Sequence, residues 1–339
     1  MPKILLAVHP KYYGPILEQS VVDELAALGE CERIGVDWSK AGTKEYRADF
    51  AARIAASDPD ILVTCWDTPK FTSETYAKTT RLKYLVHLAG TVRGIVDREC
   101  IEKGLLVSNW GTVIARTIAE AALMMILGAL RRVTTTQFHL HVRKGWRRGE
   151  VRPMSLFERR VGLHGLGGIA RELVKLLAPF GCRIESYSPH APDETFKRLG
   201  VVRQPSLRDL YATNDVVSVH AGLTPETRGM VTRDILASMK DGAVLVNTAR
   251  GAVIDEEALA AELQSGRIHA ALDVFEREPP AEDSPLRGLE NCMLIPHEAG
   301  PTDDRKVDMG RLGLRNIKRY LSGEEPEFLV TLERYDLST

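Results

Sequence analysis

Hydrophobic and polar positions alternate in blocks along the first hundred residues of the chain. Short apolar runs of about five residues are separated by segments with helical periodicity. The apolar runs lie at 4–8, 34–38, 61–65, 84–88 and 105–108, and the helical segments at 17–28, 46–56, 73–79 and 96–103. Strands that alternate with helices predict a parallel sheet with helices on both faces.

A second series of apolar runs begins at residue 161 and repeats this pattern. The runs lie at 161–166, 183–188, 201–203, 215–220, 243–248, 270–275 and 293–296, and the helical segments at 169–178, 207–211, 233–238, 256–265 and 304–321. The predicted fold class is therefore α/β, with two doubly wound parallel-sheet domains. Residues beyond Gly323 are expected to return to the first domain, because a terminal strand or turn needs a partner sheet.

Residues 117–142 join the two series and are predicted to form one long helix. Thr117 and Glu120 have the spacing of a capping box at its start. Residues 121–127 are apolar on nearly every side, and such a helix must be buried on several faces. Burial between domains or between two subunits would satisfy this requirement.

A glycine-rich turn follows the first strand of the second series. Gly165, Gly167 and Ala170 form the pattern G-x-G-x-x-A. In a dinucleotide-binding turn these positions permit the tight turn, the close approach of backbone N–H groups to a pyrophosphate, and close packing of helix on strand. An incidental glycine turn is the alternative. The preceding strand, the following helix and a second strand that ends at Ser188 favour dinucleotide binding.

Arg250 follows the apolar run 243–246, at the edge of a parallel sheet where ligands bind. An arginine there can bind a carboxylate through two parallel N–H donors and polarise an adjacent carbonyl. The alternative is an arginine at a helix entry that pairs with Asp255 or Glu256.

His297 directly follows another predicted strand and a proline, and small residues after it leave room for a ligand. A lone histidine is usually structural, but one beside an arginine and a carboxylate at neighbouring strand ends is a candidate general acid. A buried carboxylate such as Glu278 would keep the imidazolium populated near neutrality. Such a pair suits protonation of a carbonyl oxygen as hydride reaches its carbon. Glu276 is interpreted as an exposed loop acid.

Composition narrows the partners and the location. A formal net charge of -1 gives no long-range field that would recruit nucleic acid or an anionic membrane. The basic residues Arg143, Lys144, Arg147 and Arg148 are interpreted as a solvated helix end or subunit contact rather than a phosphate contact. The five cysteines are widely spaced without a C-x-x-C pair, which favours reduced thiols, no metal site and a cytoplasmic protein. The chain has no apolar run long enough for a membrane span or signal peptide.

These motifs resemble the D-isomer-specific 2-hydroxyacid dehydrogenase family, most closely between residues 161 and 300. The matching segments are 165–170, 219–227, 247–251, 273–279 and 297–300. The resemblance implies a Rossmann-type cofactor domain at 111–300, inserted in a flavodoxin-like substrate domain made of 1–110 and 301–339. It also implies an active site in the cleft between them and a homodimer joined through the 117–142 helix.

The resemblance also implies roles for individual residues. Arg250 would bind the carboxylate and keto oxygen of the substrate, and Glu278 would orient and charge His297, which exchanges the proton. Asp273 would hold the nicotinamide carboxamide. The backbone of Ala89, Gly90 and Thr91 would hold the substrate carboxylate, with a tight turn as the alternative. Trp66 and Trp146 would line the pocket, Trp146 from the partner subunit.

The residues expected to border the cofactor share positions in the glycine loop or at the carboxyl ends of the later strands. They are Gly165, Leu166, Gly167, Gly168, Ile169, Ser188, Pro189, His190, His220, Ala221, Gly222, Thr227, Thr248, Ala249, Arg250, Asp273, His297 and Gly300.

Some positions depart from the family pattern. Ser188 stands where NAD-preferring members carry an acidic residue that binds the ribose and repels a 2′-phosphate. NADP or dual use is therefore favoured over strict NAD use, although no arginine adjoins Ser188 and the nearby cationic candidates are His190 and Lys197. Arg93 and Glu298 also differ from the usual residues. They suggest a larger or more acidic 2-keto acid, with Arg93 as a second anion site.

The predicted function is that of an NAD(P)-dependent oxidoreductase, which transfers hydride between a nicotinamide cofactor and a 2-keto acid/D-2-hydroxy acid pair. The alternative is a catalytically weak dinucleotide-sensing scaffold, like the transcriptional corepressors that share this fold. Such corepressors usually have long flexible tails and a peptide-docking cleft, and the sequence shows no obvious tail.

Overall fold

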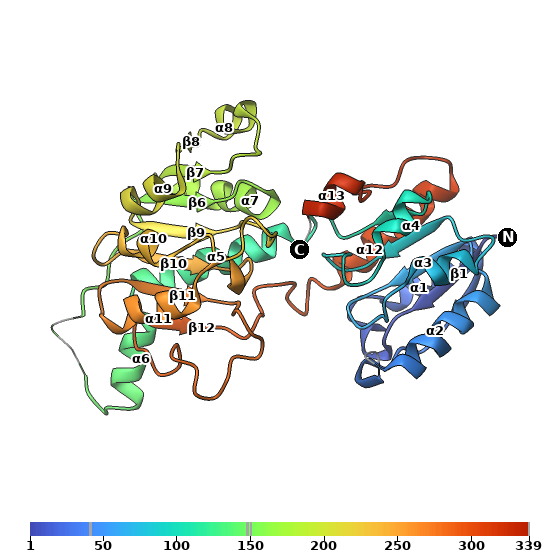
Figure 1. Ribbon diagram of the computed structural model, residues 1–339, viewed down its shortest axis with the longest axis horizontal. Coiled ribbons are helices and arrows are strands. Elements are labelled where there is room, and N and C mark those ends of the chain that lie inside the picture. Colours follow the sequence, from blue (N-terminus) through green and yellow to red (C-terminus); the bar gives the residue numbers. More distant parts are fainter. Residues whose placement is uncertain (41–42, 147–148, 150, 338–339) are drawn as a thin grey trace. The chain divides into compact units, whose positions relative to one another are not determined.

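The computed structural model describes residues 1–339 except 41–42, 147–148, 150 and 338–339, and leaves out the side chains of 38 and 337. The chain divides into two compact units. One is Met1–Ile114 together with Thr302–Thr339, and the other is Ala115–Pro301. Figure 1 colours the first unit blue to cyan and red, and the second green to orange. Each unit is described by itself.

Among the described residues, the first unit forms one five-stranded parallel sheet, in the order β2-β1-β3-β4-β5. This order is that of a flavodoxin-like sheet. The strands are β1 (Lys3–Ala7), β2 (Glu30–Arg33), β3 (Ile61–Thr64), β4 (Tyr84–His87) and β5 (Leu106–Ser108). The helices are α1 (Gln19–Leu28), α2 (Lys44–Ser57), α3 (Ser73–Ala77), α4 (Arg98–Glu102), α12 (Val307–Leu321) and α13 (Leu332–Leu337). Every residue of β3 and β4 is buried, which explains their continuous apolar runs.

The second strand of the first unit differs from the prediction. A strand was expected at 34–38, but β2 lies at Glu30–Arg33, and Trp38–Lys40 forms a 3-10 helix. As an edge strand, β2 carries polar residues, and Glu32 pairs with Lys3 at 3.0 Å. The apolar residues that suggested a strand, Ile34 and Val36, are buried in the connection after it.

The C-terminal segment lies against the first sheet. Leu329 forms an antiparallel bridge with Ser108, and the N–H of Val330 donates to the carbonyl of Val107 at 2.8 Å. The hydroxyl of Tyr335 donates to the carbonyl of Val96 at 2.8 Å. Residues from both ends of the chain therefore build the first unit.

In the described part of the second unit, seven parallel strands form one sheet, in the order β12-β11-β10-β9-β6-β7-β8. The strands are β6 (Arg160–His164), β7 (Arg183–Tyr187), β8 (Val202–Arg203), β9 (Val216–Val219), β10 (Val244–Asn247), β11 (His269–Leu272) and β12 (Cys292–Leu294). The helices are α5 (Ala115–Leu130), α6 (Val133–His141), α7 (Gly168–Leu177), α8 (Asp193–Leu199), α9 (Leu207–Thr213), α10 (Arg233–Ala237) and α11 (Glu256–Gln264). Helix α8 was not predicted.

Counted from β6, this order is the doubly wound Rossmann order with one further strand at the edge. The predicted α/β class with two doubly wound parallel sheets is confirmed. In such a sheet the chain reverses direction across the sheet between β6 and β9, and ligands bind at the carboxyl ends of the strands near that point.

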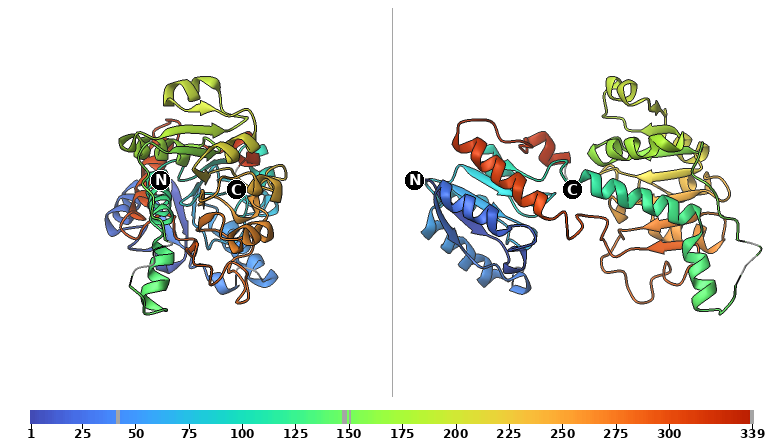
Figure 2. Two further views of the ribbon diagram at one scale, coloured as in Figure 1. Left: turned by 90° about the vertical axis from the view of Figure 1, so that its left-hand side faces the viewer. Right: turned by 180° about the vertical axis from the view of Figure 1, so that it is seen from behind.

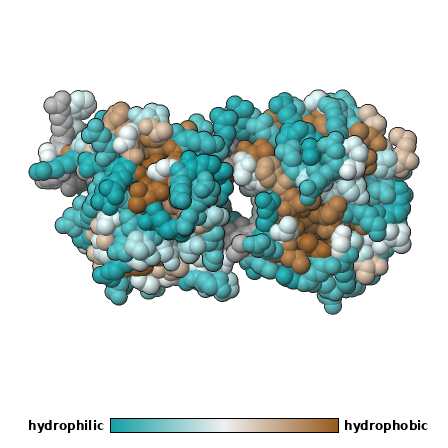
Figure 3. Space-filling model, turned by 90° about the horizontal axis from the view of Figure 1, so that it is seen from above, coloured by the Kyte–Doolittle hydropathy of each residue, from teal (hydrophilic) through white to brown (hydrophobic). Residues whose placement is uncertain are grey.

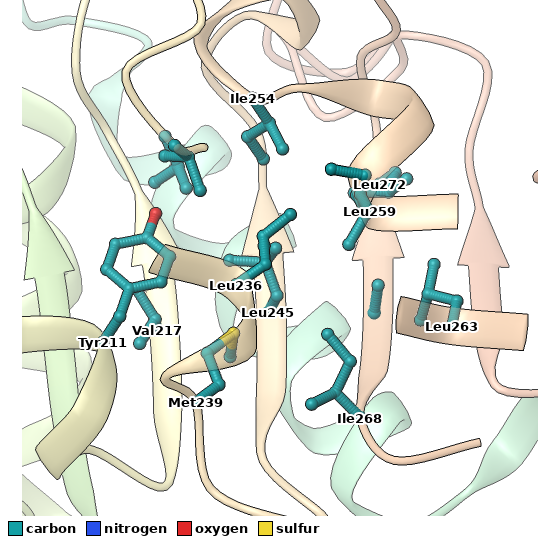
Figure 4. Packing of buried hydrophobic residues seen from close by; sticks show 14 of the residues in the cluster. Tyr211, Val217, Leu236, Met239, Leu245, Ile254, Leu259, Leu263, Ile268 and Leu272 are labelled. Atoms are coloured by element: carbon teal, nitrogen blue, oxygen red, sulfur yellow. The ribbon is translucent and has the colours of Figure 1, made fainter. Parts of the chain in front are cut away.

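Both faces of the second sheet are covered by apolar packing. On one face Tyr211, Val217, Leu245 and Leu272 belong to a cluster that includes residues of α9, α10 and α11 (Figure 4). On the other face α5 crosses the sheet and packs beside α7 (Figure 2). Burial on both faces fixes the strands, and thus the positions of the loops at their carboxyl ends.

The predicted single helix at 117–142 is wrong, because the segment is divided into α5 and α6. Arg132 has a left-handed φ of 57°, and its guanidinium donates to the carbonyls of Ala129 and Gly242 at 3.1 and 3.2 Å. The bond to Ala129 satisfies a carbonyl in the last turn of α5, and the bond to Gly242 holds Arg132 in the left-handed conformation that ends the helix. Helix α5 also begins two residues before Thr117, so the expected capping box does not form its start.

Helix α6 differs from α5 in its surroundings. None of its residues, all of which the structure describes, is buried, and Val133 and Leu140 are exposed.

The face of the molecule in Figure 3 is mostly hydrophilic, with apolar patches on both units. None of the helices in the described ranges is long and apolar enough to span a membrane.

Candidate active site

The glycine loop lies between β6 and α7. Gly165 has a φ of +99°, and a Cβ there would approach the backbone C and O of His220 to 2.9 Å. Gly167 is the N-cap residue of α7, and a Cβ there would meet nothing within 4 Å. Ala170 is fully buried against the sheet. The loop is therefore tightly packed at Gly165 and open at Gly167, where the N–H groups of the first turn of α7 begin.

The end of β7 contacts this loop. The backbone N–H of Leu166 donates to Ser188 Oγ at 3.2 Å, and the N–H of Gly165 donates to the carbonyl of Tyr187 at 2.9 Å. Pro189 and His190 follow in an exposed turn.

An arginine that the sequence analysis missed also reaches this turn. Arg203 Nη1 donates to the carbonyl of Ser188 at 3.1 Å. The residue lies on β8, which pairs with β7 through Ser186 and Arg203. Only this strand pairing brings Arg203 to Ser188, so the local sequence carried no signal for it.

Two buried polar atoms at the next strand ends have no hydrogen-bond partner within the part of the chain that the structure describes. They are Nδ1 of His220, after β9, and Oγ1 of Thr248, after β10. His220 Nε2 lies 2.9 Å from Ser218 Oγ, and burial lowers the pKa of His220 to about 3, so the ring is neutral. Ala221 and Gly222 follow His220, and Thr227 Oγ1 donates to the carbonyl of Gly222 at 2.7 Å.

These features fit a bound dinucleotide. The open Gly167, the N-terminus of α7 formed by Gly168 and Ile169, and the two unsatisfied polar atoms lie along one edge of the sheet. Unsatisfied buried polar atoms are costly unless a ligand or water binds them. Backbone N–H groups at a helix N-terminus are suited to phosphate.

Arg250 follows β10 and is held in place by Asn247. The side-chain Oδ1 of Asn247 accepts from the N–H of Ala249, and its Nδ2 donates to the carbonyl of Arg250, both at 3.0 Å. Nη1 of Arg250 donates to the carbonyl of Ala249 at 2.6 Å. Burial lowers the pKa of Arg250, and the negative charge of Glu278 opposes this effect.

The alternative partners of Arg250 have other hydrogen bonds. Asp255 caps α11 by accepting from the N–H of Ala258 at 2.9 Å, and Glu256 accepts from the N–H of Glu276 at 2.8 Å. These contacts give both acids a local structural role. The electrostatic neighbour of the guanidinium is Glu278, from the loop after β11.

His297 and Glu278 form a direct pair. Nδ1 of His297 lies 2.6 Å from Oε2 of Glu278, whose Oε1 accepts from the N–H of Phe275 at 3.1 Å. The side chains are 49% and 36% exposed, so the expectation that Glu278 is buried is wrong. His297 itself has a left-handed φ of 54°, and strained backbone at such a position is a common feature of functional sites.

Asp273 organises the loop that carries His297. It is 1% exposed, and its Oδ1 accepts from the N–H groups of Glu298 and Ala299 at 2.7 and 3.0 Å. Its backbone carbonyl accepts from the N–H of His297 at 2.8 Å. Burial raises the pKa of Asp273, while the two backbone donors oppose the rise. A Cβ on Gly300 would meet nothing within 4 Å, so the loop opens there.

The candidate substrate loop in the first unit, residues 89–91, packs against the ring of Trp110. A Cβ on Gly90 would approach the Trp110 ring to 2.7 Å, and the N–H of Trp110 donates to the carbonyl of Ala89 at 3.1 Å. Trp66 is 38% exposed, and its ring centroid lies 5.7 Å from that of Trp110. Thr91 Oγ1 accepts from the N–H of Arg93 at 3.4 Å.

Two further predicted positions, Arg93 and Trp146, have surroundings that can be described within their own units. The charge of Arg93 acts on Tyr335 and Asp336 of α13 within the first unit. Trp146 in the second unit is 75% exposed. In the basic cluster beside it, Arg143 pairs with Glu290, and Arg147 and Arg148 lie outside the described residues.

Comparison with known proteins places this geometry in a family. Residues 123–299 match the profile of the D-isomer specific 2-hydroxyacid dehydrogenase, NAD binding domain. This match covers more than half of the chain. The chain belongs to the D-isomer-specific 2-hydroxyacid dehydrogenase family.

Named members of this family are similar over most of the chain. A glyoxylate reductase of Korarchaeum cryptofilum is 34% identical over 282 residues, which cover 81% of this chain and 84% of the reductase. A D-3-phosphoglycerate dehydrogenase of Methanocaldococcus jannaschii is 34% identical over 276 residues, which cover 81% of this chain. The chain spans about half the length of that dehydrogenase, since the match covers 52% of it.

A solved structure of the family is similar over its full length. It is an NADPH-dependent glyoxylate/hydroxypyruvate reductase of Sinorhizobium meliloti, with a TM-score of 0.75, 26% identity and coverage of 100% of both chains. All these relatives are dehydrogenases or reductases, which supports the oxidoreductase prediction over the corepressor alternative.

Proposed function

We propose that this family member is an NAD(P)-dependent oxidoreductase that interconverts a 2-keto acid and a D-2-hydroxy acid. The observation that carries the proposal is the pairing of His297 with Glu278 at 2.6 Å, electrostatically coupled to Arg250. All three residues follow strands of the sheet that also carries the glycine loop. A cation, an acid–base group and a dinucleotide loop together suit the reduction of a ketone that bears a carboxylate.

The catalytic roles follow from which atoms already have partners. Nδ1 of His297 is occupied by Glu278, so Nε2 is the ring nitrogen that donates a proton to the keto oxygen, or removes it in the reverse direction. Glu278 orients the ring through its contact with Nδ1. Arg250 binds the substrate carboxylate with parallel N–H donors and polarises the carbonyl.

The residues that would hold the cofactor lie along the same edge. N–H groups of Gly167, Gly168 and Ile169 would contact the pyrophosphate, and Nδ1 of His220 and Oγ1 of Thr248 would gain a polar partner. The remaining cofactor-binding residues are those expected from the sequence, with Ser188, Pro189 and His190 beside the adenosine ribose. A bound nicotinamide would supply or accept the hydride.

Further proposals concern the domains and the partner. Residues 111–300 would form the cofactor domain, and 1–110 with 301–339 the substrate domain, whose Ala89–Thr91 loop would bind carboxylate through backbone N–H groups. The exposed apolar residues of α6 and Trp146 support a homodimer through the 117–142 segment.

Buried free thiols such as Cys65 and Cys292 support a cytoplasmic location. The net charge of -1 supports a small-molecule rather than a nucleic-acid partner.

A panel of 2-keto acids tests the function. We expect loss of absorbance from NADH or NADPH with at least one substrate. The substitution His297→Ala should lower kcat by about 10²–10⁴-fold, as for removal of a general acid, because no proton donor would remain at the carbonyl. Cofactor affinity and melting temperature should change far less than kcat, which separates a catalytic role from a structural one. Binding of the dinucleotide without turnover of any keto acid would instead support the scaffold alternative.

A further inference from the structure

We propose that Arg203 binds a phosphate on the 2′ position of the adenosine ribose, so that the chain selects NADP(H). This inference rests on the proposed function, because it concerns the dinucleotide that the glycine loop would hold. It deepens that function by naming a specificity-determining residue and the form of the cofactor.

The first observation is the chemistry at the end of β7. An acidic residue at this position binds the ribose hydroxyls and repels a 2′-phosphate. Ser188 instead offers an uncharged hydroxyl, whose oxygen accepts from the N–H of Leu166 at 3.2 Å. The serine keeps the hydrogen bond between the end of β7 and the glycine loop, but it brings no negative charge to the ribose position. A phosphate there meets no repulsion from residue 188.

The second observation is the placement of Arg203. Its Nη1 donates to the carbonyl of Ser188 at 3.1 Å, and its Nη2 to the carbonyl of Ala191 at 2.5 Å. Its guanidinium lies over the ring of Phe196, 4.0 Å from the centroid. Phe196 is almost fully buried, so the cation has a fixed surface to stack on. Two carbonyls and one ring thus hold the guanidinium at the turn before any ligand binds.

The third observation is that Arg203 keeps capacity for an anion. The side chain is 34% exposed, and its carboxylate partner Asp193, at 2.9 Å, is 80% exposed. An ion pair with so exposed a carboxylate is weak, because water screens it. A phosphate monoester carries up to two negative charges and accepts charge-assisted hydrogen bonds, so it competes well for the guanidinium.

The other nearby cations are less suited to this role. His190 lies in the same turn, but an exposed imidazole does not offer the paired N–H donors of a guanidinium. Lys197 is exposed on α8, and no hydrogen bond or ion pair among the described residues joins its ammonium group to the turn. Arg203 alone among these residues donates directly to the backbone of residue 188, the residue that faces the ribose in a dinucleotide-binding fold.

Arg203 could instead serve only to clamp the turn, and the two roles predict different binding of cofactor fragments. If Arg203 only stabilises the turn, it raises the affinity for every ligand of the turn equally. A phosphate-binding residue supports only ligands that carry the 2′-phosphate. The pair 2′,5′-ADP and 5′-AMP differs in that one group, so it distinguishes the roles without any turnover.

The experiment is calorimetric titration of the full chain with both fragments. We expect the unsubstituted protein to bind 2′,5′-ADP at least about tenfold more tightly than 5′-AMP, as for a hydrogen-bonded charge pair. Arg203→Ala should abolish this difference and leave the affinity for 5′-AMP within about twofold. The matched control is Arg198→Ala, which removes the same charge from an exposed position on α8 and should preserve the preference.

A second variant keeps the inference testable if Arg203→Ala fails to fold. Asp193→Asn leaves the arginine in place and removes the competing carboxylate, so it should strengthen binding of 2′,5′-ADP and leave 5′-AMP unchanged. Equal affinity of the unsubstituted protein for both fragments would overturn the inference alone. An equal loss of both affinities in Arg203→Ala would show that Arg203 only stabilises the turn, and this result would also overturn the inference. Binding of neither fragment, nor of NAD or NADP, would overturn the proposed function as well.

Discussion

The carboxyl edge of the seven-stranded sheet has two halves that are built from different materials. Around β6 and β7 it consists mainly of backbone groups and small residues, namely the open N-cap at Gly167 and the N–H of Leu166 on Ser188, with the side chain of Arg203 beside them. After β10, β11 and β12 it consists of long polar side chains, namely Arg250, Glu278 and His297. Under the proposed function, the first half would hold the dinucleotide and the second would bind the keto acid and move its proton.

The difference shows why the two halves tolerate change differently. A backbone site depends on the space and conformation that glycine allows, so any side chain at the wrong glycine damages it. A side-chain site depends on geometry and charge, so even a substitution that preserves charge damages it. Substitutions of the side chains after β10, β11 and β12 should therefore affect catalysis. Substitutions in the glycine loop around β6 and β7 should affect dinucleotide binding or stability.

The largest expected effect is on the kinetics, from a substitution among the side chains after β10, β11 and β12. Arg250→Lys should lower kcat/KM by about 10²-fold or more, ~2.7 kcal/mol, because an ammonium group cannot offer two parallel donors to a carboxylate. Dinucleotide affinity, measured by fluorescence titration, should change little. The matched control is Arg277→Lys in the exposed part of the loop after β11, which should leave the kinetics unaffected. Unchanged kcat/KM in Arg250→Lys would remove Arg250 from the site.

The next largest effect distinguishes two glycines of the glycine loop, Gly165 and Gly167. Gly165→Ala should lower the free energy of unfolding by about 2 kcal/mol, because its φ of +99° is strained for a residue with a side chain, and the new Cβ would collide with His220. Gly167→Ala should leave stability nearly unchanged, since its Cβ meets open space, but weaken dinucleotide binding about tenfold. Denaturant melts and titrations measure both effects. Equal effects of the two substitutions would contradict the distinction between a packed and an open glycine.

The effect that is smallest at neutral pH concerns two buried histidines, His164 at the end of β6 and His220 after β9. Burial lowers the pKa of His164 to about 4 and that of His220 to about 3, both below the ordinary value of 6.5. Between these folded values and 6.5 the unfolded chain binds protons that the folded chain does not. The free energy of unfolding should therefore fall as the pH falls below about 6.5, by up to about 1.4 kcal/mol per pH unit for each histidine.

A substitution attributes this slope to a particular ring. His164→Phe keeps an aromatic side chain beside Tyr187 and Tyr211 but removes one titrating group, so the decline of stability between pH 6.5 and 5 should be shallower. His141→Phe, on the exposed face of α6, is the control and should leave the slope unchanged. A steeper or identical slope in His164→Phe would contradict the assignment.

The sequence predicted features that depend on local pattern. The glycine spacing located the loop after β6, and the apolar runs located the strand ends that carry Arg250 and His297, because parallel strands bring their carboxyl ends to one edge. It did not predict the contact of Arg203 with Ser188, because β8 is a two-residue strand whose pairing with β7 is tertiary. It also missed the break before α6, since Arg132 is held there by the carbonyl of Gly242 from a distant segment.

The side chain of Asn247 has a consequence for the affinity of any ligand that Arg250 would bind under the proposed function. Its amide spans the turn after β10, with one end on the N–H of Ala249 and the other on the carbonyl of Arg250. The main chain that carries the guanidinium is therefore ordered before any ligand binds. Less conformational freedom is lost in each encounter, because that ordering took place once, when the polypeptide folded.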